Sequence, residues 1–267
     1  MTMTVGIAGL GAIGLPLARA LDAGVEGLSL IAVSVRDQTK ALANLAGFRH
    51  PPRLVELADL AAADIVVECV PAALFERVAL PAIDAGRILV VLSAGALLPR
   101  MHLMRRAVAA GGRIVVPTGA LIGLDAVRAA AEGPVESVTI ETRKPPNGLE
   151  GAPYLVKNGI SVAGLTEPLL VFEGNALDAA AGFPANVNVA AALALAGIGP
   201  VRTKVRIWAD PGVERNIHSI AVEADAARFA MKIENVPSND NPRTGKLVTL
   251  SALACLRGLV SPLKIGS

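Results

Sequence analysis

The sequence predicts an α/β fold made of two domains. In the first half, short apolar runs alternate with helical patterns, which is typical of a parallel sheet covered by helices. After about residue 122, strands with polar–apolar alternation and two helices indicate an open mixed or antiparallel sheet, an α+β unit. A last helical pattern, roughly 243–260, has one apolar stripe. We therefore expect a first domain at 1–122, with the helical segment 242–267 packing back on it, and a second domain at 123–241.

Composition narrows the class of protein. Hydrophobic residues make up 53% and charged residues 18% of the 267 residues, which favours a folded core over disorder. The 25 basic and 23 acidic residues are interspersed and aromatic residues make up only 3%, so neither nucleic acid nor a membrane surface is expected as a partner. Cys69 and Cys255 predict neither a disulfide framework nor a metal pair. No secretory leader is recognisable, so we expect a cytoplasmic protein.

A glycine-rich turn follows the first predicted strand, residues 5–8. It reads Gly9-Leu10-Gly11-Ala12-Ile13-Gly14 and runs into a helical pattern. In that context the first glycine allows the tight turn, the second lets backbone approach a pyrophosphate, and the third lets the helix pack on the strand. The helix N-terminus adds free N–H groups for the phosphates. We expect this turn to bind a dinucleotide; the alternative is a strand–helix turn whose glycines serve only its own geometry.

The second predicted strand, 28–35, ends at Arg36-Asp37, about 20 residues beyond the glycines, where the ribose is read in dinucleotide-binding folds. An acidic side chain there accepts hydrogen bonds from the ribose of NAD, whereas an arginine pairs with the 2′-phosphate of NADP. Since both residue types are present, we predict that either NAD or NADP binds. The alternative is that both are solvated loop charges.

Three further strands are predicted at 63–71, 87–95 and 112–120, with helices at roughly 54–62, 73–85 and 98–110. Ligands of such sheets bind beyond the carboxyl ends of the strands. Small or turn-forming residues at these ends leave room for a nicotinamide and its ribose, which makes Cys69, Val70, Pro71, Ser93 and Gly95 expected cofactor contacts. Glu68 is the one charge within such an end; a structural role is the favoured interpretation over a catalytic one.

The second half is predicted to hold several strands and two helices. A helix within 183–199 has Asn186 or Asn188 as its candidate N-cap and ends at Gly197. Strands 201–211 and 218–224 are expected to be joined by a tight turn. The remaining predicted elements are a strand at 135–146, a strand leading into a helix at 166–183, and a strand at 228–238.

Longer motifs carry a resemblance to a known family. They are GLGAIG (9–14), SAGAL (93–97), PTGALIGLDA (117–126), TRKPP (142–146), FEGNA (172–176), FPANVNVAAALALAGIG (183–199), ADPGVERNIHSI (209–220) and IENVPSNDNPRTGKL (233–247). On these motifs the chain resembles the L-aspartate dehydrogenases over nearly its whole length.

The resemblance implies a Rossmann domain plus a substrate and dimerisation domain, usually in a homodimer. It implies oxidation of L-aspartate with NAD or NADP to iminoaspartate, which hydrolyses to oxaloacetate and ammonia or feeds the pyridine ring of NAD biosynthesis. It further implies that His218 is the catalytic histidine and that Ile122 and Asn188 contact the cofactor. Leu177 departs from the basic residue expected at its position, which bears on substrate specificity.

His218 stands at a predicted strand start just after a turn. Taken alone, such a histidine is more often a core or edge residue hydrogen-bonded to a backbone carbonyl. The resemblance favours the catalytic role. The chemistry it implies explains the residue type, because an amino acid gives up hydride from Cα only when its amine is neutral, so a group must accept the ammonium proton. Histidine, whose unperturbed pKa is about 6.5, suits this general acid/base role and the activation of water.

The two carboxylates of aspartate require cationic or amide donors. The candidates are Lys144, Asn186, Asn188, Thr203 and Arg215, among which the sequence does not choose; Lys144, Asn186 and Thr203 are taken as the substrate-binding set. For each residue the alternative is a solvated surface group.

Two other functions remain open at this point. One is a related dehydrogenase or imine reductase acting on another small amino acid, since homoserine dehydrogenase and dihydrodipicolinate reductase share the architecture. The other is a non-catalytic NAD(P)-binding protein, although an intact RNIHSI motif argues against it.

Overall fold

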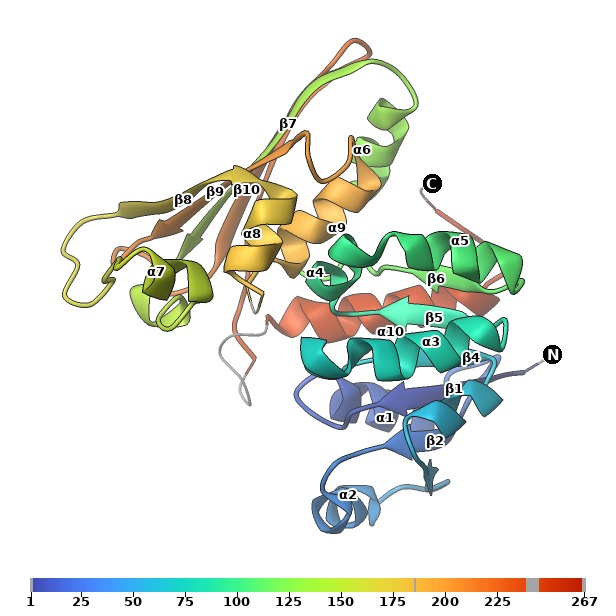
Figure 1. Cartoon of the computed structure of the whole chain (residues 1–267). Helices are drawn as coiled ribbons and strands as arrows, with labels where there is room; N and C mark the ends of the chain where they lie inside the picture. The colour runs from blue at the N-terminus through green and yellow to red at the C-terminus, as the bar shows by residue number, and fades with distance from the viewer. Residues whose placement is uncertain (1, 185, 239–244, 266–267) are drawn as a thin grey trace. The chain divides into compact units, whose positions relative to one another are not determined.

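The computed structural model describes residues 2–184, 186–238 and 245–265 (Figure 1). They form two compact units. The first unit comprises the chain up to Ser93 together with Arg100–Pro117 and Val248–Lys264, and the second comprises Ala94–Pro99 and the described part of Thr118–Leu247. The boundaries expected after residues 122 and 241 stay a prediction. The part of the 233–247 motif at 239–244 lies outside the described residues, as does the predicted start of the last helix.

The first unit contains a six-stranded parallel sheet in the order β3-β2-β1-β4-β5-β6. The α/β prediction is confirmed. The strand order reverses between β1 and β4, and in open parallel sheets ligands bind beside such a reversal, beyond the carboxyl ends of the strands. The strands are β1 (Met3–Ala8), β2 (Leu28–Ser34), β3 (Arg53–Leu54), β4 (Ile65–Glu68), β5 (Ile88–Val91) and β6 (Arg113–Val115).

Helices cover both faces of this sheet, with α3 and α5 on one face and α1 and α10 on the other (Figure 1). The helix expected at 54–62 is wrong: this stretch forms β3 and a single 3₁₀ segment, too short to propagate as an α-helix. The helical elements are α1 (Gly14–Asp22), α2 (Gln38–Leu45), η1 (Ala58–Ala62), η2 (Ala72–Leu74), α3 (Phe75–Asp84), α5 (His102–Ala109) and α10 (Lys246–Val260).

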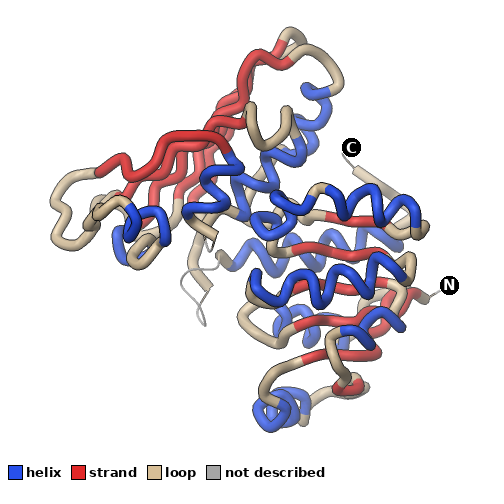
Figure 2. Tube along the Cα trace, viewed as in Figure 1, coloured by secondary structure: helices blue, strands red, loops and turns tan. Residues whose placement is uncertain are grey.

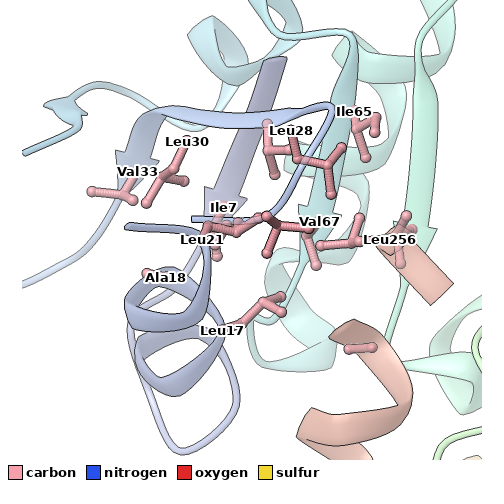
Figure 3. Packing of buried hydrophobic residues seen from close by; sticks show 14 of the residues in the cluster. Ile7, Leu17, Ala18, Leu21, Leu28, Leu30, Val33, Ile65, Val67 and Leu256 are labelled. Carbon is pink, nitrogen blue, oxygen red and sulfur yellow. The ribbon is translucent and has the colours of Figure 1, made fainter. Parts of the chain in front are cut away.

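The core on the α1 face is built from alternate residues of the central strands, because successive side chains of a strand point to opposite faces. Ile7 and Val67 meet Leu17 and Leu21 of α1 there (Figure 3). The last helix, α10, adds Ala252 and Leu256 to the same cluster. A helix near the C-terminus therefore completes the hydrophobic core of the unit that the N-terminal residues form.

The second unit contains a five-stranded mixed sheet in the order β11-β10-β7-β9-β8. Its helices gather against one face and leave the other uncovered (Figure 2). The strands are β7 (Val135–Lys144), β8 (Leu169–Asn175), β9 (Thr203–Ala209), β10 (Ile217–Ala224) and β11 (Arg228–Glu234). The helical elements are α4 (Ala94–Leu97), η3 (Leu98–Arg100), α6 (Leu124–Ala131), η4 (Pro146–Gly148), α7 (Pro153–Lys157), α8 (Ala176–Gly182) and α9 (Asn188–Ala196).

The tight turn expected between strands 201–211 and 218–224 is wrong. The two strands, β9 and β10, are not neighbours, because β7 lies between them, parallel to β9 and antiparallel to β10. Asp210 does form a local turn, accepting a hydrogen bond from the Gly212 amide at 2.9 Å, but the chain then crosses the end of β7. This crossing sets His218 directly opposite Thr142.

The last helix gives a direct test of the core. Replacing the fully buried Leu256 with alanine should lower the free energy of unfolding by about 2–5 kcal/mol, the cost of a cavity where a leucine was packed. Chemical denaturation followed by circular dichroism measures this loss. Leu250, which is 60% exposed on the same helix, is the control: its alanine variant should change stability by less than about 0.5 kcal/mol. Equal losses in both variants would contradict the packing of α10.

Candidate active site

In the turn between β1 and α1, packing within the chain requires a glycine at two of the three glycine positions but not at the third. At Gly9, φ is +92° and an added Cβ would lie 2.6 Å from the Cys69 carbonyl oxygen. At Gly14 an added Cβ would lie 1.9 Å from the Gly9 carbonyl oxygen. At Gly11 an added Cβ would meet nothing within 4 Å. The packing of the chain explains Gly9 and Gly14, whereas the open space at Gly11 is what close approach of a pyrophosphate requires.

Helix α1 begins without a side-chain cap. Its N-cap is Ile13, which makes no capping hydrogen bond, and Ala12 lies just before it in the same turn. The N-cap side chain thus leaves the first helical turn uncapped, although the Leu15 amide donates to the Gly11 carbonyl, and an uncapped terminus favours an anion. These features fit the phosphates of a dinucleotide.

One cavity of about 670 Å³ extends from this turn along the carboxyl ends of β1, β2 and β4. Most of the cofactor contacts predicted in the first unit line it. They are Gly9, Gly11, Arg36, Asp37, Cys69, Val70 and Pro71.

Asp37, a predicted cofactor contact that lines this cavity, also caps a helix. Its carboxylate caps helix α2 by accepting a hydrogen bond from the Lys40 amide at 2.9 Å. Arg36, Lys40 and Arg77 line the same cavity, together with the acidic residues Asp37 and Glu56. Lys40 and Arg77 were not predicted, because one lies in the following helix and the other in α3, and neither has a characteristic spacing from the glycines.

Glu68 joins the carboxyl ends of β4 and β5 through hydrogen bonds. Its fully buried carboxylate accepts hydrogen bonds from the Val70 amide at 3.0 Å and from the Ser93 amide and hydroxyl at 2.9 and 3.0 Å. Burial raises the pKa of this carboxyl, and the hydrogen bonds from Ser93 and Val70 oppose that rise. The contacts support the structural interpretation of Glu68, and they leave the Ser93 side chain bonded to protein.

In the second unit, His218 is buried on the helix-covered face of the sheet, 2% exposed. Its Nδ1 lies 2.9 Å from Oγ1 of Thr142, its cross-strand partner. Burial, and then the positive charge of Lys144, lower the pKa of His218 to about 3. The group expected to titrate near neutrality is therefore a neutral imidazole in this setting. Thr142 was not predicted, although the alternation of β7 places it on the face of Lys144, two residues away.

Lys144 is the second polar group of this face, 6% exposed. Its Nζ donates a hydrogen bond to Oδ1 of Asn186 at 2.9 Å. Both residues line a cavity of about 620 Å³ that also includes Arg215 and Asn235. The neighbouring Arg143 points to the other face, where it pairs with Asp210 at 2.9 Å.

The remaining predicted residues make other contacts. The Asn188 side chain accepts a hydrogen bond from the Gly95 amide at 3.0 Å, so two predicted cofactor contacts bond to each other. Neither Asn186 nor Asn188 caps α9, whose N-cap is Val187; that prediction is wrong because both side chains bond elsewhere. Ile122 is exposed.

Thr203 lies at the opposite end of the sheet from Lys144. Its hydroxyl donates to the Gly199 carbonyl at 2.8 Å, and it pairs with Val138, six residues along β7 from Lys144. Six strand residues span roughly 20 Å. We therefore do not propose Thr203 as a substrate ligand.

Two kinds of feature are not found in the part of the chain that the structure describes. No group of three or more His, Cys, Asp or Glu side chains there is arranged to hold a metal ion. No helix among those residues is long and apolar enough to cross a membrane.

Comparisons with known proteins agree in both halves of the chain. Residues 125–259 match the family model described as aspartate dehydrogenase, C-terminal, and residues 9–117 match the model described as homoserine dehydrogenase, NAD binding domain. The chain is 55% identical over 266 residues to L-aspartate dehydrogenase of Bradyrhizobium diazoefficiens, covering 99% of this chain and 94% of that protein. It is 51% identical over 265 residues to L-aspartate dehydrogenase 3 of Bordetella bronchiseptica, covering 98% and 97%. The crystal structure of aspartate dehydrogenase from Thermotoga maritima aligns over 100% of both chains, with a TM-score of 0.77 and 26% identity.

The glycines make separable contributions that variants can test. Gly11→Ala should leave the melting temperature unchanged and weaken dinucleotide binding by roughly 10-fold, because the added methyl group occupies ligand space. Gly14→Ala should instead destabilise the fold by at least about 2 kcal/mol, because its methyl group overlaps backbone. Calorimetric titration and thermal unfolding measure the two effects. Destabilisation by Gly11→Ala with unchanged affinity would contradict this assignment.

Arg36 should distinguish the two cofactors. Arg36→Ala should weaken NADP binding by roughly 10-fold or more, the loss of a charge-assisted hydrogen bond, and leave NAD binding within about 2-fold. Calorimetric titration with each dinucleotide measures this. Arg49→Ala removes the same charge from an exposed site outside the cavity and should affect neither. An equal loss of NAD and NADP affinity in the Arg36 variant would be the contrary result.

Proposed function

Because this chain belongs to the aspartate dehydrogenase family, we propose that it catalyses the reversible NAD(P)-dependent oxidative deamination of L-aspartate. The products are iminoaspartate and, after hydrolysis, oxaloacetate and ammonia. The observation that carries the proposal is the pair of buried polar side chains, His218 and Lys144, on one sheet face. A dicarboxylic amino acid needs both a cation and a proton acceptor, and this face supplies the two together.

Substrate recognition is proposed for Lys144 and Asn186. The buried ammonium of Lys144 attracts anions strongly in its low-dielectric surroundings, and the proposed anion is a carboxylate of aspartate. Asn186, which accepts a hydrogen bond from Lys144, keeps its amide N–H groups as further donors for a carboxylate. Arg215 lines the same cavity and adds a second cation for the second carboxylate.

His218 is proposed as the general acid/base. As a neutral imidazole it can accept a proton, and the one that must leave is on the substrate ammonium. The pKa of about 3 makes it a weak base on its own. The positive charge of Lys144 is the second of the two causes of this low pKa. A substrate carboxylate beside Lys144 offsets that charge, so binding of the substrate raises the pKa of His218. After water has added to the iminium carbon and lost a proton to solvent, the protonated imidazole gives its proton to the nitrogen that departs as ammonia.

The cofactor is a nicotinamide dinucleotide, NAD or NADP. When bound, its nicotinamide ring accepts hydride from Cα of the substrate. The residues proposed to hold it are Gly9, Gly11, Ala12, Ile13, Gly14, Arg36, Asp37, Cys69, Val70, Pro71, Ser93, Gly95, Ile122 and Asn188. In the proposed division of the chain, residues 1–122 with 242–267 bind the dinucleotide and residues 123–241 bind the substrate.

A homodimer in the cytoplasm is the proposed assembly and location. The face of the β7–β11 sheet that the described helices leave uncovered supports a dimer, because it offers a surface on which a second copy of the chain can pack. Leu169 and Leu170 on the edge strand β8 are also exposed. Light scattering should give twice the chain mass of 27.2 kDa, and a mass of one chain would contradict the dimer. Supply of iminoaspartate to NAD biosynthesis is the proposed use of the product.

The direct test of the activity is reduction of NAD and NADP with a panel of amino acids at alkaline pH. Turnover confined to L-aspartate is expected. Turnover of L-homoserine or another amino acid in its place would support the related-dehydrogenase alternative, and binding of the cofactor with no turnover of any of them would support the non-catalytic one.

The role of His218 predicts a specific kinetic phenotype. His218→Ala should lower kcat by roughly 100-fold or more, the contribution of a positioned general base, and leave the Kd of the dinucleotide within about 2-fold. Steady-state kinetics and calorimetric titration measure the two quantities. Near wild-type kcat in this variant would reject the role. A matched loss of cofactor affinity would indicate a structural effect instead.

A further inference from the structure

Within the described part of the chain, His218, the proposed general acid/base, is hydrogen-bonded to the protein through one ring nitrogen and not through the other. Nδ1 of His218 lies 2.9 Å from the Thr142 hydroxyl oxygen. Among the described residues Nε2 has no hydrogen-bond partner, yet it is not among the fully buried unpaired atoms, which are Trp208 Nε1 and Asn235 Oδ1. The small exposed fraction of the His218 side chain therefore includes Nε2. The ring is held at Nδ1 and offers Nε2 to a ligand.

The partner of His218 is also held rigidly. Thr142 is 4% exposed and lies in β7, the strand that is bonded to β10 on one side and β9 on the other. It is the direct antiparallel partner of His218 in the register. Threonine is β-branched and has few χ1 rotamers. Its hydroxyl is therefore fixed by the sheet rather than by a mobile loop.

A hydroxyl can either donate to Nδ1 or accept from it, and the two cases give different tautomers. If Oγ1 donates, the proton of the neutral ring is on Nε2, which then cannot accept another. If Oγ1 accepts from Nδ1–H, the Nε2 lone pair is free. This second bond also persists when Nε2 gains a proton, because both nitrogens of the imidazolium are donors.

The chemistry of the partner matters as well. A carboxylate at this position would favour the charged imidazolium and raise the pKa of the histidine. A hydroxyl orients the ring without adding charge. It thus keeps a neutral imidazole beside Lys144, whose charge already opposes protonation of His218.

We infer that Thr142 is a positioning residue that holds His218 in the Nδ1–H tautomer and directs Nε2 to the substrate. The catalytic consequence rests on the proposed function, whereas the tautomer itself does not. Thr142 acts through His218 and needs no contact with the substrate.

The tautomer can be measured without turnover. The chain has three histidines, and His50 and His102 are exposed, so ¹⁵N-histidine labelling gives few signals. The signals of His218 are assigned by their loss in His218→Asn. Long-range ¹H–¹⁵N correlation at neutral pH should show wild-type His218 protonated at Nδ1 alone. Thr142→Val, which keeps the shape and removes the hydroxyl, should move the proton to Nε2 or give a mixture.

Kinetics should follow the tautomer. Thr142→Val is expected to lower kcat by roughly 10- to 100-fold, the range known for loss of a partner that orients a metal-binding histidine. KM for L-aspartate should stay within about 3-fold, and Thr142→Ser should restore most of the rate. In the His218→Ala background, Thr142→Val should have no further effect. Thr139→Val, on the half-exposed opposite face of the same strand, is the matched control and should leave both the tautomer and kcat unchanged.

Two outcomes would overturn the inference. One is an Nε2–H tautomer in the wild type, and the other is an unchanged tautomer and kcat in a folded Thr142→Val variant. If Thr142→Val fails to fold, Thr142→Ser with the proton on Nε2 alone would be decisive against it. Failure of the proposed function gives a different pattern, in which the tautomer responds to Thr142 but L-aspartate is not turned over.

Discussion

Burial of a histidine and a lysine on a sheet face otherwise made of alkyl and threonine side chains is the constraint on which the second unit depends. His218 and Lys144 lie in line with Ile140, Ile220 and Val222 on the face that the helices cover. Burying such groups without partners costs several kcal/mol, so each needs a fixed neighbour. Thr142 is hydrogen-bonded to His218, and Asn186 is hydrogen-bonded to Lys144. The strand order β10-β7-β9 makes this possible, because it puts a histidine and a lysine from distant parts of the chain at the same end of one face.

The first unit is subject to a different kind of constraint, which is steric. Close backbone contacts at Gly9 and Gly14 bring the start of α1 tight against β1, and Glu68 ties the ends of β4 and β5 together. Contacts within the chain thereby hold the carboxyl ends of the strands around one cavity. Gly11 is the glycine of this turn that internal packing leaves unexplained, and close approach of a phosphate is its proposed reason. A cavity held by such contacts loses little conformational entropy when a ligand binds.

The sequence predicted the first unit better than the second. The glycine turn and the strand–helix alternation depend on local contacts, so a short stretch of residues specifies them. The order of the second sheet depends on long-range pairing: residues 210–216 look like a hairpin turn, yet the pairing of β7 with both β9 and β10 decides the topology. His218 was predicted from the family motif and Lys144 from its residue type, and both stay predictions as site residues. Thr142 was not predicted, because its contact arises only from the register opposite His218, and the sequence gives no sign that the Thr203 hydroxyl bonds locally to Gly199.

The central claim is that hydride leaves Cα of L-aspartate for the bound nicotinamide. The most direct measurement uses L-aspartate deuterated at Cα, with mass analysis of the reduced cofactor and comparison of the rates for labelled and unlabelled substrate. The account predicts one deuterium on C4 of the nicotinamide and slower turnover of the labelled substrate wherever hydride transfer limits the rate. Reduced cofactor without deuterium, or release of the label to water, would contradict it.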